Sequence, residues 1–283
     1  MKTNPFAVLL CLVLAAPAFA ADPRIESVEF QSHGVTLAGS IVLPAEPPVH
    51  AAVVFIHGSG RQSRNLAVAA RFAQDGIAAL VYDKRGAGES GGEYEGDQSV
   101  SEKNIALLAD DAVAAFAALA AHPDLDGLPI GFAGISQAGW IAPIAAQQRP
   151  DARFLLLWSS PVCKVSEEDI FSTYTADGDS LSVPSYAEAL RARTEPYVWP
   201  DFLGRDTDSG ETLKTLVIPG LWLFSDNDGS VPVDLSIERL QALRQQGQRF
   251  DYVLFSGLGH NNMGRSFATA VDWVTNTVVS HAK

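Results

Sequence analysis

Residues 130–139 read IGFAGISQAG, and this stretch decides the fold. Its first six residues are a short continuous apolar run, which is typical of a strand buried on both faces of a sheet. A helical pattern begins immediately afterwards and continues to residue 148. Ser136 therefore lies on a sharp turn from strand to helix, with small residues on both sides. A serine at such a turn is either the N-cap of the helix or an exposed nucleophile.

The same alternation of apolar runs and helical patterns continues on both sides of this stretch. An opening hairpin is expected at residues 28–30 and 35–43, and further strands at 51–56, 77–82, 154–158, 216–224 and 250–254. Helices are expected at 66–74, 105–119, 137–148, 233–243 and 266–279. Ser99 and Glu102 resemble a capping box in front of the second helix. Alternating strands and helices predict an α/β fold, a doubly wound and mostly parallel sheet with functional loops at the strand carboxyl ends.

Residues 163–213 interrupt this alternation with acidic residues, scattered aromatics, prolines and glycines. Only short helical patterns occur there, such as 186–193. We interpret this segment as a small lid insertion within one domain of residues 21–283. Its aromatic residues either line an acyl pocket or pack within the lid, and both readings stay open; they are Tyr197, Trp199 and Phe202.

The composition excludes several classes of protein. Of 283 residues, 47 % are hydrophobic and 19 % are charged, which excludes a disordered chain. Two cysteines are too few for a disulfide scaffold. The formal net charge of −13 argues against nucleic-acid binding, because phosphate recognition needs clustered Lys and Arg.

The first twenty residues have the pattern of a signal peptide. Lys2 is followed by an apolar run over residues 6–16, and the tripeptide AFA at 18–20 matches a cleavage site. This pattern predicts export to a bacterial periplasm or secretion. No later stretch is long and apolar enough for a membrane span. After cleavage one thiol remains, Cys163, which we expect to be a core residue.

The stretch HGSG at 57–60 follows the predicted strand at 51–56. A loop in this place can donate one backbone N–H to an oxyanion, and the start of the helix after Ser136 can donate another. We assign these donors to Ser59, with Gly60 as the alternative, and to Gln137. A glycine-rich turn without such a role is the other reading. For His57 a structural role is favoured over catalysis or metal binding.

Two late loops offer an acid and a base. The stretch SDNDGSVP at 225–232 contains Asp226 and Asp228, and either could orient a histidine or serve only as a turn carboxylate. His260 lies in a glycine-containing loop after the last predicted strand, where it could accept the proton of Ser136. No metal-binding or phosphate-binding motif occurs, so we expect neither a metal nor a cofactor.

Ser136, an aspartate and His260 follow one another in the chain, each after a predicted strand. With this order the chain resembles the α/β-hydrolase superfamily over about residues 25–280. It is most similar to bacterial serine esterases near the dienelactone hydrolases and prolyl oligopeptidases. The resemblance rests on HGSG at 57–60, YDKRGAGES at 82–90, the turn at Ser136, DGSVP at 228–232 and GH at 259–260.

The resemblance has consequences for individual residues. The family acid stands three residues before the Val-Pro pair, which favours Asp228 over Asp226. The run at 82–90 is similar to a family structural loop, here a turn held by Asp83 and Arg85. The family elbow has glycine where this chain has Ala138, a small departure.

The predicted function is hydrolysis of a small-molecule ester or acyl substrate through an acyl-enzyme on Ser136, His260 and Asp228. A peptidase or amidase with the same triad is one alternative. A non-catalytic binding protein on this fold is another, although a complete triad argues against it. Arg61 and Arg64 follow the HGSG loop and are expected to be solvated surface residues. Nothing in the residues indicates the oligomeric state.

Overall fold

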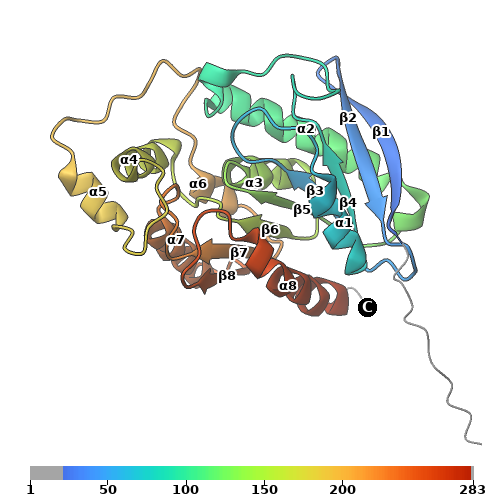
Figure 1. The fold of residues 1–283 in the computed structure, drawn as a ribbon. Helices are drawn as coiled ribbons and strands as arrows, with labels where there is room; N and C mark the ends of the chain where they lie inside the picture. The colour runs from blue at the N-terminus through green and yellow to red at the C-terminus, as the bar shows by residue number, and fades with distance from the viewer. Residues whose placement is uncertain (1–21, 282–283) are drawn as a thin grey trace, which may run out of the picture.

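The computed structural model describes residues 22–281, so the predicted signal peptide lies outside the described residues. Its centre is one eight-stranded sheet in the order β1-β2-β4-β3-β5-β6-β7-β8 (Figure 1). β1 and β2 form an antiparallel hairpin, β2 is also antiparallel to β4, and the remaining pairings are parallel. The predicted α/β class with a mostly parallel sheet is therefore confirmed. The strands are β1 (Arg24–Ser32), β2 (Val35–Leu43), β3 (Ala51–Ile56), β4 (Ile77–Tyr82), β5 (Ile130–Ile135), β6 (Leu155–Trp158), β7 (Gly220–Ser225) and β8 (Phe250–Phe255).

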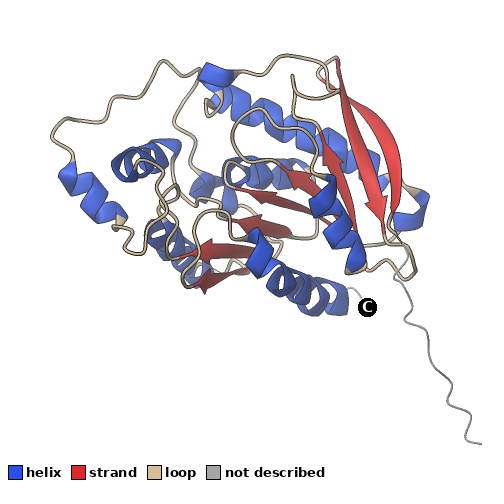
Figure 2. Cartoon of the chain, viewed as in Figure 1, coloured by secondary structure: helices blue, strands red, loops and turns tan. Residues whose placement is uncertain are grey.

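Helices cover both faces of the sheet (Figures 1 and 2). One face packs against α1 (Leu66–Gln74) and α8 (Met263–Trp273). The other packs against α2 (Glu102–Ala120), α3 (Ala138–Gln148) and α7 (Val233–Gln245). Every residue of β3 and β4 is buried, which explains why these strands are apolar without alternation.

The capping box predicted at Ser99 is wrong. Ser99 ends a short 3-10 turn at Gly96–Gln98, and α2 begins only after Ser101, whose side chain accepts a hydrogen bond from the backbone N–H of Asn104 at 3.2 Å. The two serines stand two residues apart, and Glu102 at the third position after Ser99 made Ser99 the better match to the sequence pattern. The carbonyl of Ser99 instead accepts hydrogen bonds from the side-chain amides of Asn104 and Gln137.

Two other boundaries differ from the expectation. β7 begins at Gly220 rather than at 216, because the backbone N–H of Leu216 donates to Leu213 and Pro219 has no N–H to offer. The closing helix begins at Met263 and ends at Trp273, where a wide π-type turn over Val274–Val278 follows.

The connection from β6 to β7 carries three helices, α4 (Val165–Thr175), α5 (Tyr186–Ala192) and α6 (Ser209–Leu213). A β-bridge joins Lys164 to Asp208 at its base. α4 and α5 lie beyond the carboxyl ends of β6 and β7 (Figure 1). The aromatic residues of this segment make contacts within it: the rings of Trp199 and Phe202 meet edge to face at 5.3 Å, and the hydroxyl of Tyr197 donates to Asp169 at 2.7 Å.

Within residues 22–281, no helix has both the length and the apolar character that a membrane span requires. Cys163 is fully buried and free, as expected of a core thiol, and burial raises its pKa.

Candidate active site

Ser136 lies directly after β5 in a left-handed backbone conformation, with φ of 56°. Such a conformation is strained for a residue with a side chain, and it occurs at functional turns. The backbone N–H of Ser136 donates to the carbonyl of Trp158 at 3.0 Å, so the sheet itself holds the turn. A Cβ placed on Gly134 would lie 2.5 Å from the Cβ of Ala138. The small residues seen in the sequence are therefore required by the close passage of β5 and α3.

The loop after β3 lies beside this turn. A Cβ on Gly58 would lie 3.4 Å from the Cβ of Ser136. In the part of the chain that the structure describes, the backbone N–H groups of Ser59 and Gln137 donate no hydrogen bond to protein. The structure therefore brings the two predicted oxyanion donors to the same strand ends as Ser136, with both N–H groups available to a ligand.

The loops after β7 and β8 bring Asp228 and His260 together. Both carboxylate oxygens of Asp228 lie 2.9 Å from Nδ1 of His260. One of these oxygens also accepts backbone N–H groups from Ser230 and Val231, each at 3.0 Å, so the buried carboxylate is fixed in place. A proton on Nδ1 satisfies this contact and leaves Nε2 free to accept a proton.

Asp226, the other candidate acid, contacts the turn after β8. Its carboxylate accepts the backbone N–H of Gly257 at 2.7 Å, and its side chain is exposed. The structure therefore pairs His260 with Asp228, which decides between the two acids that spacing alone left open. Asp226 instead stabilises the turn after β8.

The electrostatic surroundings of His260 are acidic. Burial alone would lower its pKa, but the hydrogen bond and the charge of Asp228 outweigh burial and raise it above the ordinary value. The charges of Asp179 and Asp177 act in the same direction. The imidazolium that forms when His260 accepts a proton is therefore stabilised from two sides.

Asp179 is a site residue that the sequence analysis missed. Its carboxylate accepts the backbone N–H of His260 at 3.0 and 3.1 Å and that of Gly229 at 3.3 Å. It therefore joins the loops that carry the acid and the base. A Cβ on Gly259 would lie 1.9 Å from this carboxylate, so glycine is required there. No local pattern marks Asp179, because the residue that it holds is 81 positions further along the chain.

Asn262 is a second residue that was missed. Its amide donates to Ser159, to the carbonyl of Leu223 and to Ser225, at 2.7 to 3.1 Å. The hydroxyl of Ser159 in turn donates to the carbonyl of His260 at 2.6 Å. The pair Asn261-Asn262 directly after the loop histidine was the signal available in the sequence.

These contacts also relate the base to the nucleophile. Trp158 accepts the N–H of Ser136, and the next residue, Ser159, holds His260. Only this short end of β6 separates the two anchoring points. Among the described residues Oγ of Ser136 makes no hydrogen bond to His260, a contact that commonly tightens only when substrate is bound.

The expectation that Arg64 is a solvated surface residue is wrong. Its guanidinium forms an ion pair with Asp83 at 2.6 Å, and its side chain is only 15 % exposed. Burial opposes ionisation of Asp83, but the hydrogen bonds from Arg64 outweigh it and lower the pKa of this carboxyl to about 2. Asp83 begins the tight turn at 83–90. Gly88 packs so closely against the Asp83 carboxylate that a Cβ there would lie 2.4 Å from it, so glycine is required at this position.

His57 is buried against Tyr82, edge to face at 4.9 Å. Burial, with the nearby charge of Lys84, lowers the pKa of His57 to about 4, so the ring is neutral at pH 7. This environment fits the structural role predicted for it.

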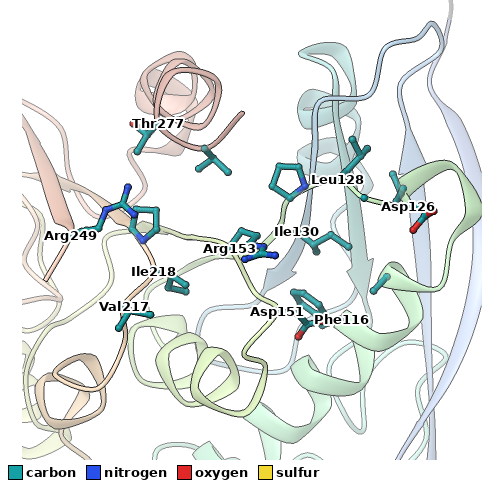
Figure 3. A pocket seen from close by; sticks show the side chains of 16 residues that line it. Phe116, Asp126, Leu128, Ile130, Asp151, Arg153, Val217, Ile218, Arg249 and Thr277 are labelled. Carbon is teal, nitrogen blue, oxygen red and sulfur yellow. The ribbon is translucent and has the colours of Figure 1, made fainter. Parts of the chain in front are cut away.

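Two further features of the described residues bear on ligand binding. In residues 22–281, no group of three or more His, Cys, Asp or Glu side chains is arranged to hold a metal ion. A pocket of about 680 Å³ lies near the amino ends of β5, β7 and β8 (Figure 3), with Arg153 and Arg249 among its lining residues. This is the opposite end of the strands from Ser136 and His260, so the pocket is separate from the candidate active site.

The chain matches a known protein family. Residues 47–191, about half of the chain, match the family model described as serine aminopeptidase, S33. The chain belongs to the serine aminopeptidase S33 family. The prediction of a serine hydrolase with the α/β-hydrolase fold is thus confirmed at the level of the family.

Individual relatives extend this result. A polyketide transferase, claH from Penicillium crustosum, is 33 % identical over 161 residues, which are 52 % of this chain and 47 % of the relative. The chain therefore spans about half the length of that relative.

Two solved structures share the fold of this S33 family member. The esterase Pf2001 of Pyrococcus furiosus has a TM-score of 0.64 at 16 % identity, over 90 % of this chain and 93 % of that one. The acylaminoacyl peptidase of Pyrococcus horikoshii has a TM-score of 0.66 at 16 % identity, over 90 % of this chain and 42 % of that one.

Proposed function

We propose that this protein hydrolyses carboxylic esters, with Ser136 as nucleophile, His260 as general base and Asp228 as the group that orients the base. The observation that carries the proposal is the contact of Nδ1 of His260 with both oxygens of Asp228, at 2.9 Å each. It directs the free nitrogen of the imidazole away from the acid. The left-handed turn at Ser136 supports the role of nucleophile, because such a turn raises the hydroxyl above the end of the sheet.

The reaction has two stages. Oγ of Ser136 attacks the ester carbonyl carbon while its proton passes to Nε2 of His260. The resulting oxyanion accepts hydrogen bonds from the backbone N–H groups of Ser59 and Gln137, each of which contributes about 3 kcal/mol to lowering the barrier. The alcohol leaves with the proton from His260. Water then attacks the acyl-enzyme by the same route and releases the acid.

An ester substrate is supported by the fold it shares with the esterase Pf2001, which the chain matches over nearly the full length of both proteins. The same proposal includes export to the periplasm or outside the cell, directed by the predicted signal peptide of residues 1–20.

A second candidate is cleavage of peptides or other amides by the same residues. Two observations favour it: the family description names an aminopeptidase, and one similar structure is an acylaminoacyl peptidase. The chemistry differs only at the leaving group, since an amine must receive the proton of His260 before it departs.

The experiment compares a series of p-nitrophenyl esters, from acetate to laurate, with aminoacyl and acylaminoacyl p-nitroanilides. Ester hydrolysis that disappears in Ser136→Ala is the expected result, and the preferred chain length measures the acyl pocket. Faster anilide hydrolysis instead supports the peptidase. A folded protein that turns over neither and is not labelled by a fluorophosphonate contradicts both, and leaves a binding protein on this fold.

A further inference from the structure

Lys84, which follows β4, is a buried lysine that the proposed mechanism does not use. It is 3 % exposed, and no carboxylate of residues 22–281 lies within ion-pair distance of it. Its ammonium donates to the carbonyl of Gly58 at 2.7 Å, the carbonyl of Gly60 at 3.0 Å and Oε1 of Gln137 at 2.9 Å. A buried charge without a counter-ion is costly, and here each of its three protons has a neutral acceptor. Burial lowers the pKa of Lys84 to about 8, so it is still mainly charged at pH 7.

The first acceptor of the Lys84 ammonium, the carbonyl of Gly58, bears on the orientation of a predicted oxyanion donor. The carbonyl of Gly58 and the N–H of Ser59 belong to one peptide group. This peptide is trans, so its oxygen and its hydrogen point in opposite directions. A hydrogen bond that holds the oxygen towards Lys84 therefore directs the N–H of Ser59 away from Lys84. Gly58 itself lies beside the nucleophile, since a Cβ on it would be 3.4 Å from the Cβ of Ser136. An acceptor bonded to a cation also makes the opposite N–H a stronger donor.

The third acceptor belongs to the residue that supplies the other oxyanion donor. The amide of Gln137 accepts from Lys84 through its oxygen and donates through its nitrogen to the carbonyl of Ser99 at 2.6 Å. The backbone N–H of Lys84 also donates to Gln62 at 3.0 Å. Lys84 thus contacts both halves of the predicted oxyanion hole.

We propose that Lys84 is a positioning residue for the oxyanion hole, which aims and polarises the N–H of Ser59 and fixes it relative to Gln137. This inference rests on the proposed acyl transfer at Ser136. Because the oxyanion exists only in the transition state and the tetrahedral intermediate, the contribution of Lys84 falls on the chemical step and not on substrate binding. A lysine that only stabilised the loop would change the melting temperature without this selectivity.

The test uses Lys84→Met, which keeps the length of the side chain and removes its charge and its donors. We expect kcat for a p-nitrophenyl ester to fall about 10- to 100-fold, less than the loss of a whole oxyanion donor, with KM within about twofold. Affinity for an alkyl trifluoromethyl ketone should fall by a similar factor, because its adduct with Ser136 places an oxyanion in the same position. Lys103→Met, at an exposed lysine of α2, is the matched control and should resemble the wild type.

Wild-type kcat and wild-type ketone affinity in a folded Lys84→Met would overturn the inference, as would a loss confined to KM. Lys84→Gln keeps one uncharged donor group and provides the same comparison if Lys84→Met does not fold; the same pattern with a smaller loss is expected. The proposed function is judged separately, by whether Ser136→Ala abolishes turnover of the wild type. Turnover that depends on Ser136 but not on Lys84 would refute only the role of Lys84.

Discussion

The two halves of the candidate site are held in different ways. In the nucleophile half, defined as the loop 57–62 and the turn at Ser136, the sheet ends themselves and Lys84 set the geometry. In the acid–base half, defined as the loops 226–231 and 257–262, the geometry depends on Asp179 in the insertion between β6 and β7. The first half is part of the core of the domain, and the second is completed by a segment outside it.

This difference implies that the two halves tolerate change differently. Each strand of a parallel sheet is hydrogen-bonded to its neighbours along its length, and the packed core opposes small displacements of the strand ends. A loop pinned by one carboxylate moves when that carboxylate is lost. Substitutions in the first half should therefore act on the chemical step alone, whereas substitutions at Asp179 should act on position, proton affinity and stability together.

The largest effect is expected for Ser136→Ala. Loss of the nucleophile should lower kcat by about a million-fold, to the residual rate that binding and the oxyanion hole support. The rate on p-nitrophenyl butyrate, with circular dichroism to verify folding, measures it. Substantial turnover in this variant would contradict the assignment of the nucleophile half.

The next largest effect separates the two aspartates. Asp228→Asn should lower kcat by about 10,000-fold, because an amide in this place disrupts the tautomer that leaves Nε2 free. Asp226→Asn is the matched control: it replaces the charged acceptor of the Gly257 N–H with a neutral amide oxygen and should cost at most about 1 kcal/mol of stability with little change in kcat. The reverse order of effects would transfer the role of the acid to Asp226.

Loss of Asp179 should have an intermediate effect. In Asp179→Ala the backbone N–H groups of His260 and Gly229 lose their acceptor, and a base displaced by a fraction of an ångström costs about 10- to 100-fold in kcat. Asp177→Ala removes a neighbouring exposed carboxylate that raises the pKa of His260 without holding its loop. Equal rates in the two variants would show that the insertion does not position the base.

The smallest effect concerns pH. His260 must be neutral to accept a proton, and its pKa is raised, so kcat/KM should fall as the pH decreases through a value above the ordinary pKa of histidine. Removal of the Asp179 charge in Asp179→Asn destabilises the imidazolium and lowers this pKa. The acidic limb of the pH profile should therefore move to lower pH, and a move to higher pH would contradict the electrostatic account.

The sequence predicts the nucleophile half better than the acid–base half. The limits of β3, α1, β4 and β5 agree with the expectation to the residue, because buried parallel strands and an amphipathic helix leave local patterns. The turn at Ser136 follows from its small neighbours. The capping serine of α2 does not, since the capping-box rule selects Ser99, whereas the helix begins after Ser101.

Residues that act across long sequence separations carried no such signal. Asp179, Arg64 and Lys84 each bind partners between 19 and 81 positions away. Lys84 lies in the run at 82–90 that resembles a family loop, but no local pattern indicates the partners of any of the three. The choice of Asp228 over Asp226 came from family resemblance and not from spacing. The structure adds the reason, which is that Asp226 is occupied by the turn after β8.

The most direct test of the central claim is covalent labelling of Ser136. The folded protein is incubated with an alkyl fluorophosphonate, and the modified peptide is identified by mass spectrometry. One adduct per chain is expected, on Ser136, formed rapidly in the wild type and at least about 1,000-fold more slowly in His260→Ala, because loss of one triad member removes most of the activation of the nucleophile. An adduct on another residue, or no adduct on folded protein, would contradict it.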